Sequence, residues 1–228
     1  MLTKEGAAAG GGRAGRREWL GLALLVLPAL LVAMDITALF LALPKLSAGL
    51  HASSVEQLWI TDSYGFAVAG FVIIMGTLGD RVGRRRLLLA GGAAFAVVSV
   101  IAAWSVSPLM LIIARGVLGL AGATLAPSTL ALISSMFADA RQRGQAIAVW
   151  ATAQFVGGAA GPVLAGLLLQ RFWWGSVFLM AVPVMVALLI AGPAVLPEYR
   201  SPAPGRLDLA SAGLSLAAVL LLVWGLKQ

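Results

Sequence analysis

The sequence contains no cysteine, and His51 is its only histidine. The lack of cysteine excludes a disulfide framework, a thiolate metal site and a cysteine nucleophile. A single histidine excludes any mechanism that needs two imidazoles. The Asp, Glu and His residues show no metal-site spacing, and no serine has a base placed to activate it. We therefore expect neither an enzyme nor a protein that binds a metal or a cofactor.

The signatures of two other kinds of transport protein are also missing. The chain has no G-x-x-x-x-G-K-[ST] loop to cradle nucleotide phosphates, so ATP-driven pumping by this chain is excluded. It has no filter sequence and no ring-forming set of like residues, which argues against an ion channel.

Charged residues are scarce as well. Only 11% of the 228 residues are charged, whereas 61% are hydrophobic, and the mean hydropathy is +0.98. A soluble core cannot absorb this much apolar surface, so the composition predicts an all-α protein that crosses a membrane several times. Apolar stretches of about twenty residues predict spans at 19–44, 57–79, 87–104, 109–136, 145–170, 175–196 and 208–226.

The loops suggest how these spans are grouped. Residues 1–18 are rich in Gly, Ala and basic residues, and are predicted to be a disordered cytoplasmic tail. A six-helix bundle is expected over 19–196. The prolines and glycine of 197–207 break any helix and predict a linker, after which 208–228 would form a seventh membrane helix.

The basic residues predict the orientation in the membrane. Twelve of the sixteen Lys and Arg residues fall on the side of the N-terminus, and three fall on the other side. Because cytoplasmic loops carry the excess of positive charge, the N-terminus is predicted to be cytoplasmic. The net charge of +7 is explained in the same way, with the lipid bilayer and not a nucleic acid as the partner. The expected aromatic belts consist of Trp19 on the inner side and Trp59, Trp104, Trp173 and Trp174 on the outer side.

Three ionisable side chains, Asp35, Asp62 and Arg115, lie within predicted spans. A charge inside the bilayer costs several kcal/mol, so such residues are functional by default. Helical rise places them about 14, 8 and 9 Å below the outer ends of their spans, where they would face one water-filled cavity.

Each of these charges has a functional and a structural interpretation. Asp35 is predicted to take up a proton or attract a cation; the alternative is that it only pairs with Arg115 to hold helices together. Asp62 has the same predicted role; the alternative is that it is simply solvated near the start of its helix. Arg115 keeps its charge, so it is expected to modulate the proton affinity of a neighbouring carboxylate.

Glycine and proline mark two further segments. The turn between the second and third spans is charged and rich in glycine, and the count of basic residues places it on the cytoplasmic side. A small-residue face in the fifth span permits close helix contact and a kink, although ordinary tight packing would explain it equally well. The turn contains Gly76, Asp80, Arg81, Gly83, Arg84 and Arg85, and the small-residue face consists of Gly157, Gly161, Pro162 and Gly166.

With these motifs, the chain from about residue 19 to its end resembles the major facilitator superfamily, and within it the fourteen-helix EmrB/QacA-type drug:proton antiporters. The charged turn matches the superfamily signature between helices two and three. Three other segments are similar to helix motifs of that family: Arg115-Gly116-x-x-Gly119-x-Ala121-Gly122, Gly157-x-x-x-Gly161-Pro162-x-x-x-Gly166, and Met34-Asp35-x-Thr37 with Leu58-Trp59-Ile60-x-Asp62.

The resemblance implies a function. Asp35 and Asp62 would serve cationic drugs and proton coupling, Arg115 would relay protons, and Asp80 would belong to a cytoplasmic latch. Asp139 is a candidate partner for the arginines of that latch, with solvated surface charge as the alternative. The protein is expected to be a bacterial inner-membrane exporter of lipophilic or cationic drugs, driven by protons.

One departure from the family pattern affects this expectation. Such transporters enclose their path with a second helical half, whereas this chain stops after its seventh predicted span. It would then be a fragment, a truncated product, or a chain that pairs with another chain. Two other functions stay open: transport of an uncharged or anionic metabolite, and a non-transporting membrane partner or remnant.

Overall fold

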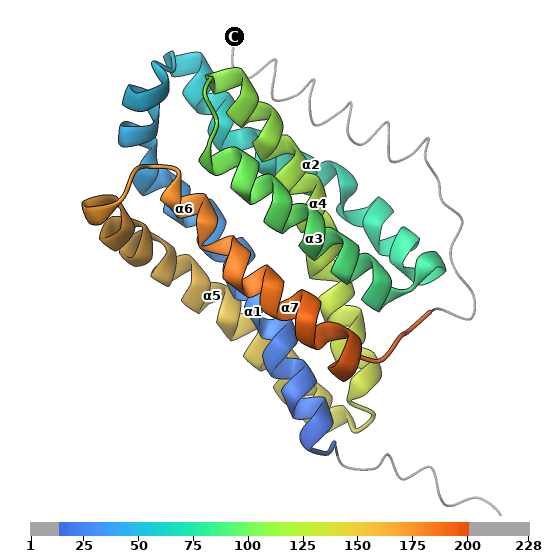
Figure 1. Cartoon of the computed structure of the whole chain (residues 1–228). Helices are drawn as coiled ribbons and strands as arrows, with labels where there is room; N and C mark the ends of the chain where they lie inside the picture. Colours follow the sequence, from blue (N-terminus) through green and yellow to red (C-terminus); the bar gives the residue numbers. More distant parts are fainter. Residues whose placement is uncertain (1–13, 201–228) are drawn as a thin grey trace, which may run out of the picture.

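The computed structural model describes residues 14–200 of the chain. Most of the predicted tail, most of the linker and the whole seventh span lie outside the described residues. The described part contains seven helices and no strand, which confirms the prediction of an all-α fold (Figure 1). The helices are α1 (Arg16–Leu50), α2 (Ser54–Val82), α3 (Arg84–Ala103), α4 (Pro108–Met136), α5 (Ala140–Arg171), α6 (Ser176–Leu179) and α7 (Ala181–Val195).

Within residues 14–200, six stretches are long and apolar enough to cross a membrane. The short helix α6 and α7 together make the sixth of these, Ser176–Val195. The helical assignment is interrupted at Met180. Pro183 explains the interruption, because it has no N–H to donate to the carbonyl of Leu179.

Helix α1 is longer than the sequence predicted. It continues through Pro28 and Pro44 and ends only at His51, whose left-handed backbone (φ 52°) forms the C-cap. The prediction that this span ends at Pro44 is therefore wrong. A proline removes one hydrogen bond from a helix, and in a membrane helix neighbouring helices and side chains compensate for that loss.

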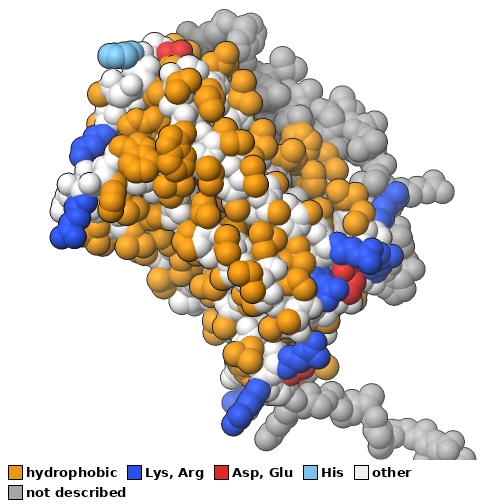
Figure 2. Space-filling model, viewed as in Figure 1, with side chains coloured by type: hydrophobic (Ala, Val, Ile, Leu, Met, Phe, Trp, Pro, Cys, Tyr) orange, Lys and Arg blue, Asp and Glu red, His pale blue; other side chains and the backbone are white. Residues whose placement is uncertain are grey.

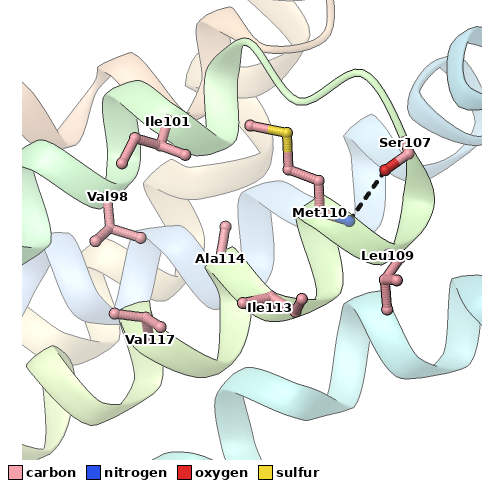
Figure 3. A pocket seen from close by; sticks show the side chains of 8 residues that line it. All are labelled: Val98, Ile101, Ser107, Leu109, Met110, Ile113, Ala114 and Val117. Atoms are coloured by element: carbon pink, nitrogen blue, oxygen red, sulfur yellow. Dashed lines mark hydrogen bonds between the residues drawn. The ribbon is translucent and has the colours of Figure 1, made fainter.

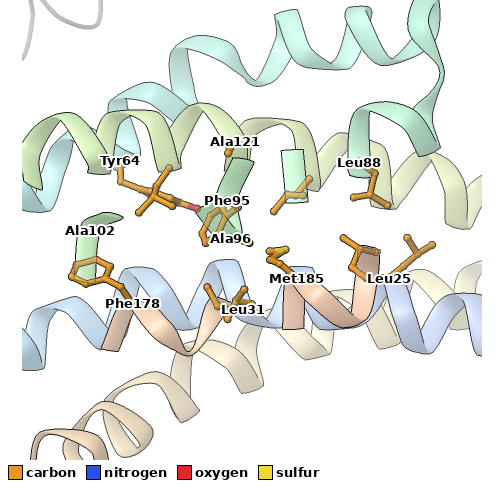
Figure 4. Close-up of a cluster of buried hydrophobic side chains, with 14 of the residues drawn as sticks. Leu25, Leu31, Tyr64, Leu88, Phe95, Ala96, Ala102, Ala121, Phe178 and Met185 are labelled. Carbon is orange, nitrogen blue, oxygen red and sulfur yellow. The ribbon is translucent and has the colours of Figure 1, made fainter. Parts of the chain in front are cut away.

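Two helix pairs form the body of the bundle. Helix α1 packs mainly against α5, and α2 packs mainly against α4. Helix α3 lies against α4 and α7, and α7 also contacts α1, so α7 closes the bundle on one side (Figure 1). A continuous cluster of buried apolar side chains runs between these helices, including Leu25, Leu31, Phe95 and Met185 (Figure 4).

The two ends of the bundle differ in charge. At one end the start of α1 meets the start of α5 and the end of α7: the Ala14 N–H donates to Gln142 Oε1 (2.8 Å) and Arg17 Nη2 donates to the Ala194 carbonyl (3.2 Å). At the other end Trp173 packs against Trp104, with ring centroids 5.5 Å apart and ring planes tilted by 54°. Figure 2 shows basic side chains concentrated toward one end of a surface that is otherwise largely apolar. The basic end is the one that the sequence predicts to be cytoplasmic.

Candidate functional site

The best-defined polar contact inside the bundle joins α1 to α4. Arg115 Nη1 donates to Asp35 Oδ2 at 2.5 Å. The Arg115 side chain is 1% exposed and that of Asp35 is 8% exposed. The structure therefore brings together two of the three intramembrane charges that the sequence singled out. Removing one partner of a buried ion pair leaves an uncompensated charge, at a cost of about 3–5 kcal/mol.

Helix α2 supplies two more contacts to the same guanidinium. Arg115 Nε donates to the Ile60 carbonyl at 3.3 Å, and the guanidinium carbon lies 4.6 Å from the centroid of the Tyr64 ring. The ring distance is within the range of a cation–π contact. Arg115 thus ties α1, α2 and α4 together at one point.

The position of Asp35 differs from the prediction. It lies fifteen residues before Leu50, the end of α1, which corresponds to about 22 Å instead of about 14 Å. The predicted distance from Asp35 to the end of its helix was too small because the prediction ended the helix at Pro44. Arg115 lies seven residues after Pro108, about 10 Å from the start of α4. The pair lies closer to the start of α4 than to the end of α1, because α1 extends further than α4 on this side of the bundle.

Asp62 occupies a different position from the buried pair. It lies on α2 and is half-buried, two residues after Ile60, whose carbonyl accepts a hydrogen bond from Arg115. The carboxylate that pairs with Arg115 is that of Asp35. Asp62 is thus a second, more exposed carboxylate on a helix that contributes to the site.

Tyr64 is a site residue that sequence reasoning missed. Its side chain is 1% exposed, and its hydroxyl has no hydrogen-bond partner in the described structure. A buried hydroxyl without a partner costs about 1–3 kcal/mol. A tyrosine in an apolar span resembles ordinary packing; the available signal was its position one helical turn after Ile60, on the same face of α2.

The small-residue face of α5 lies directly against α1. A Cβ atom at Gly157 would collide with the Leu30 carbonyl oxygen, and one at Gly161 would collide with Thr37 Oγ1. Pro162 is inside α5, and a Cβ at Gly166 would make an ordinary contact with Leu41. Two of the four predicted residues therefore make close backbone contact with the helix that carries Asp35.

The charged turn between α2 and α3 is folded around Gly83. Gly83 has φ +117°, and a Cβ atom there would collide with the Glu198 carboxylate. Arg84 Nη2 pairs with Asp80 Oδ1 at 2.7 Å, and the Arg84 N–H donates to the Tyr199 carbonyl at 2.9 Å. Arg81 lies in the last turn of α2. Gly76 is one turn before Asp80, and a Cβ there would make an ordinary contact with Pro127.

Glu198 is the partner of this turn that the sequence analysis did not identify. Its carboxylate accepts from the Arg85 N–H at 3.2 Å and lies 3.6 Å from the side chains of both Arg85 and Arg86. Of the two alternatives for Asp139, the structure does not show pairing with these arginines: Asp139 caps α5 by accepting from the Gln142 N–H at 2.8 Å. A carboxylate three residues before a helix N–H satisfies that free donor, which explains its placement.

Two apolar cavities lie outside this polar network. One of about 410 Å³ lies between α3 and α4, where Ile101, Ile113 and Val117 line it (Figure 3). Another, of about 720 Å³, is bounded by α1, α5 and α7 and has Arg171 at its rim. Neither is lined by Asp35, Asp62 or Arg115. The ion pair is therefore enclosed by protein in this conformation.

Six spanning helices around a buried Arg–Asp pair, with a charged glycine turn at one end, define a polytopic membrane protein of the transporter class. The chain belongs to the major facilitator superfamily, whose family profile matches residues 25–227.

Comparison with individual proteins agrees with this assignment. The chain is 50% identical over 211 residues to the multidrug efflux pump LfrA of Mycolicibacterium smegmatis, covering 92% of this chain and 42% of that protein. It is 41% identical over 211 residues to the methyl viologen resistance protein SmvA of Salmonella typhimurium, covering 92% and 43%. A crystal structure of the peptide transporter POT matches the fold with a TM-score of 0.69 at 20% identity, covering 90% of this chain and 45% of that one. The chain thus spans about two-fifths of the length of the curated relatives it matches.

Proposed function

We propose that this chain forms the N-terminal part of a proton-coupled exporter of lipophilic or cationic drugs in the bacterial cytoplasmic membrane, with its N-terminus in the cytoplasm. The observation that carries the proposal is the Asp35 carboxylate, buried in the membrane bundle and paired with Arg115 at 2.5 Å. Similarity to proteins named for multidrug efflux and methyl viologen resistance supports the substrate class.

The proposed coupling is competition for one carboxylate. A proton from the outer side bonds to an oxygen of Asp35, which removes its negative charge and its attraction for both Arg115 and a bound cation. The cation then leaves to the outside. When the site faces the cytoplasm, Asp35 releases the proton and its charge becomes available to the next cation. Asp62, more exposed on α2, attracts the cation toward this site.

The charged turn is proposed to act as the cytoplasmic latch. Its arginines contact Glu198 just beyond α7, so the α2–α3 turn and the end of the sixth span are held together. Opening to the cytoplasm would separate these groups. Because the latch is partly solvated, each ion pair contributes little to stability and can break within a transport cycle.

The test uses the complete protein encoded by the gene, produced in bacteria that lack their own drug exporters. Everted membrane vesicles are energised to form a proton gradient, and uptake of methyl viologen or ethidium is measured with and without an uncoupler. We expect uncoupler-sensitive uptake that Asp35→Asn abolishes and Asp62→Asn weakens. Asp139→Asn is the matched control, because asparagine also caps a helix and the residue is distant from the site.

Other outcomes would refute the role of Asp35 or indicate a different function. Normal cation uptake by Asp35→Asn would refute the role of Asp35. Proton-driven flux of uncharged or anionic compounds, without cation transport, would indicate a metabolite porter. Absence of any flux, with the protein correctly inserted, would indicate a non-transporting membrane partner.

A further inference from the structure

Tyr64 is the buried polar group near the ion pair that the proposed coupling does not yet use. It extends from α2 into the apolar core, in the region of Phe95 and Ala96 (Figure 4). Its hydroxyl has no hydrogen-bond partner in the described structure. Buried polar groups without partners are uncommon in native proteins, so this one requires an explanation.

Helix α4 leaves space for Tyr64 because two of its residues there are glycines. A Cβ at Gly119 would collide with the Tyr64 carbonyl oxygen, and a Cβ at Gly122 would lie 2.6 Å from the Tyr64 hydroxyl oxygen. Both glycines follow Arg115 on α4, by one and two helical turns. The same stretch of α4 therefore supplies the guanidinium and the space for the ring beside it.

The ring alone accounts for the contact seen here. The guanidinium carbon of Arg115 lies 4.6 Å from the ring centroid, and the face of an aromatic ring attracts a cation without help from the hydroxyl. A phenylalanine would make the same contact without burying an unpaired hydroxyl. The hydroxyl is therefore not needed for the contact seen here, which leaves it available as an acceptor in a state where Arg115 is not paired with Asp35.

We propose that Tyr64 is a positioning residue for Arg115: its ring holds the guanidinium beside Asp35, and its hydroxyl accepts an N–H of Arg115 when Asp35 is protonated. This inference rests on the proposed function. In the step, a proton bonds to Asp35 Oδ2, the hydrogen bond from Arg115 Nη1 to that oxygen breaks, and a guanidinium N–H turns to the Tyr64 hydroxyl oxygen. Arg115 keeps its charge throughout, its Nε still donates to the Ile60 carbonyl, and the N–H that leaves Asp35 gains a new acceptor.

Removing the hydroxyl and removing the ring have different expected effects. Tyr64→Phe keeps the ring contact but removes the acceptor that stabilises the protonated state of Asp35. The pH midpoint of proton-coupled methyl viologen uptake should then move down by about one pH unit, a tenfold change in proton concentration, as for one hydrogen bond to a charged group. Tyr64→Leu removes both groups and should lower uptake more than tenfold at every pH.

Tyr199→Phe is the matched control, since Tyr199 is the other tyrosine and lies at the charged end, where its backbone carbonyl accepts from the Arg84 N–H. It should leave the pH midpoint unchanged. Thermal unfolding in detergent separates folding from function: Tyr64→Phe should unfold at the wild-type temperature or above, because it buries no unpaired hydroxyl.

A second measurement is independent of transport. Infrared titration of the purified protein follows the C=O band of the protonated carboxyl that Asp35→Asn removes. In Tyr64→Phe this band should appear at a pH about one unit lower than in the wild type. If the wild type transports no drug but the infrared shift is present, the proposed function fails and the role of Tyr64 stands. An unchanged band and an unchanged transport midpoint in Tyr64→Phe would overturn the inference.

Discussion

At the scale of single residues, the feature with the largest energetic consequence is the enclosed pair of Arg115 and Asp35. Both side chains are almost fully buried, so neither charge is compensated by water. Losing one partner is costly because each buried charge is stabilised only by the other.

Replacing Arg115 alone should therefore be more harmful than replacing the pair. We expect Arg115→Ala to lower the free energy of unfolding by about 3–5 kcal/mol, because it leaves the Asp35 carboxylate buried and unpaired. The double variant Arg115→Leu with Asp35→Asn should recover much of this loss. The free energy of unfolding of each variant is measured by denaturant titration of the purified protein in detergent, with circular dichroism monitoring the helical content. Equal stability of Arg115→Ala and the wild type would mean that water reaches the carboxylate.

Gly83 is the residue whose backbone conformation most restricts substitution. Gly83→Ala adds a Cβ at φ +117°, where it would also collide with Glu198. We expect a loss of about 1–3 kcal/mol, from strain at a backbone angle that other residues rarely adopt. Gly144→Ala is the control, because nothing lies within 4 Å of its added Cβ and alanine favours the helix. Thermal unfolding should show a lower melting temperature for Gly83→Ala and not for Gly144→Ala.

The sequence identified some of these residues and missed others for a physical reason. Asp35 and Arg115 were predictable because a charge in an apolar span is costly and so needs a purpose. Tyr64 and Glu198 were not predictable in the same way. A tyrosine is compatible with an apolar span and a glutamate with a loop, so only their neighbours in space reveal their roles.

At the scale of secondary-structure elements, α1 is held in place by its contact with α5. The carbonyl of Leu30 lies where a side chain at Gly157 would begin, so the two backbones touch. This contact is five residues from Asp35 along α1. The position of the carboxylate therefore depends on the absence of a side chain on the neighbouring helix.

Two adjacent glycines of α5 allow a direct test of that dependence. Gly157→Ala should separate α1 from α5, lower the melting temperature by several degrees and reduce proton-coupled drug uptake severalfold. Gly158→Ala should do neither, because its Cβ would meet only Thr37 Cγ2 at 4.0 Å. Alanine is favoured over glycine in a helix by about 1 kcal/mol, so the control is expected to be neutral or stabilising. If both variants behave alike, the close approach of α1 and α5 does not matter.

Helix existence was easier to predict than helix length. Each of the first six predicted spans overlaps a helix or, for the sixth, the pair α6 and α7, because about twenty apolar residues must satisfy their backbone groups internally. The residues at which the helices begin and end were less predictable. Proline normally marks an end, yet α1 passes through Pro44, and polar residues extend α1, α2 and α5 beyond their apolar stretches.

At the scale of the whole molecule, the two ends of the bundle differ in charge, and the complete lack of cysteine offers a way to orient them. Val106, in the α3–α4 connection, is 85% exposed. Arg141 is exposed at the opposite, basic end, near the start of α5. Each position can therefore carry the only thiol in the chain.

A membrane-impermeant maleimide should label Val106→Cys in intact cells and should label Arg141→Cys only after the cells are permeabilised. This result is expected because basic residues are in excess at the Arg141 end, which predicts that this end is cytoplasmic. Labelling is read as a mass increase of the purified protein, and the cysteine-free parent is the control. The reverse pattern would place the N-terminus outside.

The contact between Arg85 and Glu198 has a consequence for biosynthesis. The two residues are 113 positions apart in the chain. At a synthesis rate of about 5–20 residues per second, the ribosome needs roughly 6–23 seconds to pass from one to the other. Throughout that interval the arginines of the turn have no Glu198 to pair with, and their unneutralised charge is available to hold the turn on the side proposed to be cytoplasmic while helices α3 to α5 are inserted. Glu198, which closes the proposed latch, is thus synthesised only after the helices that precede it have been inserted.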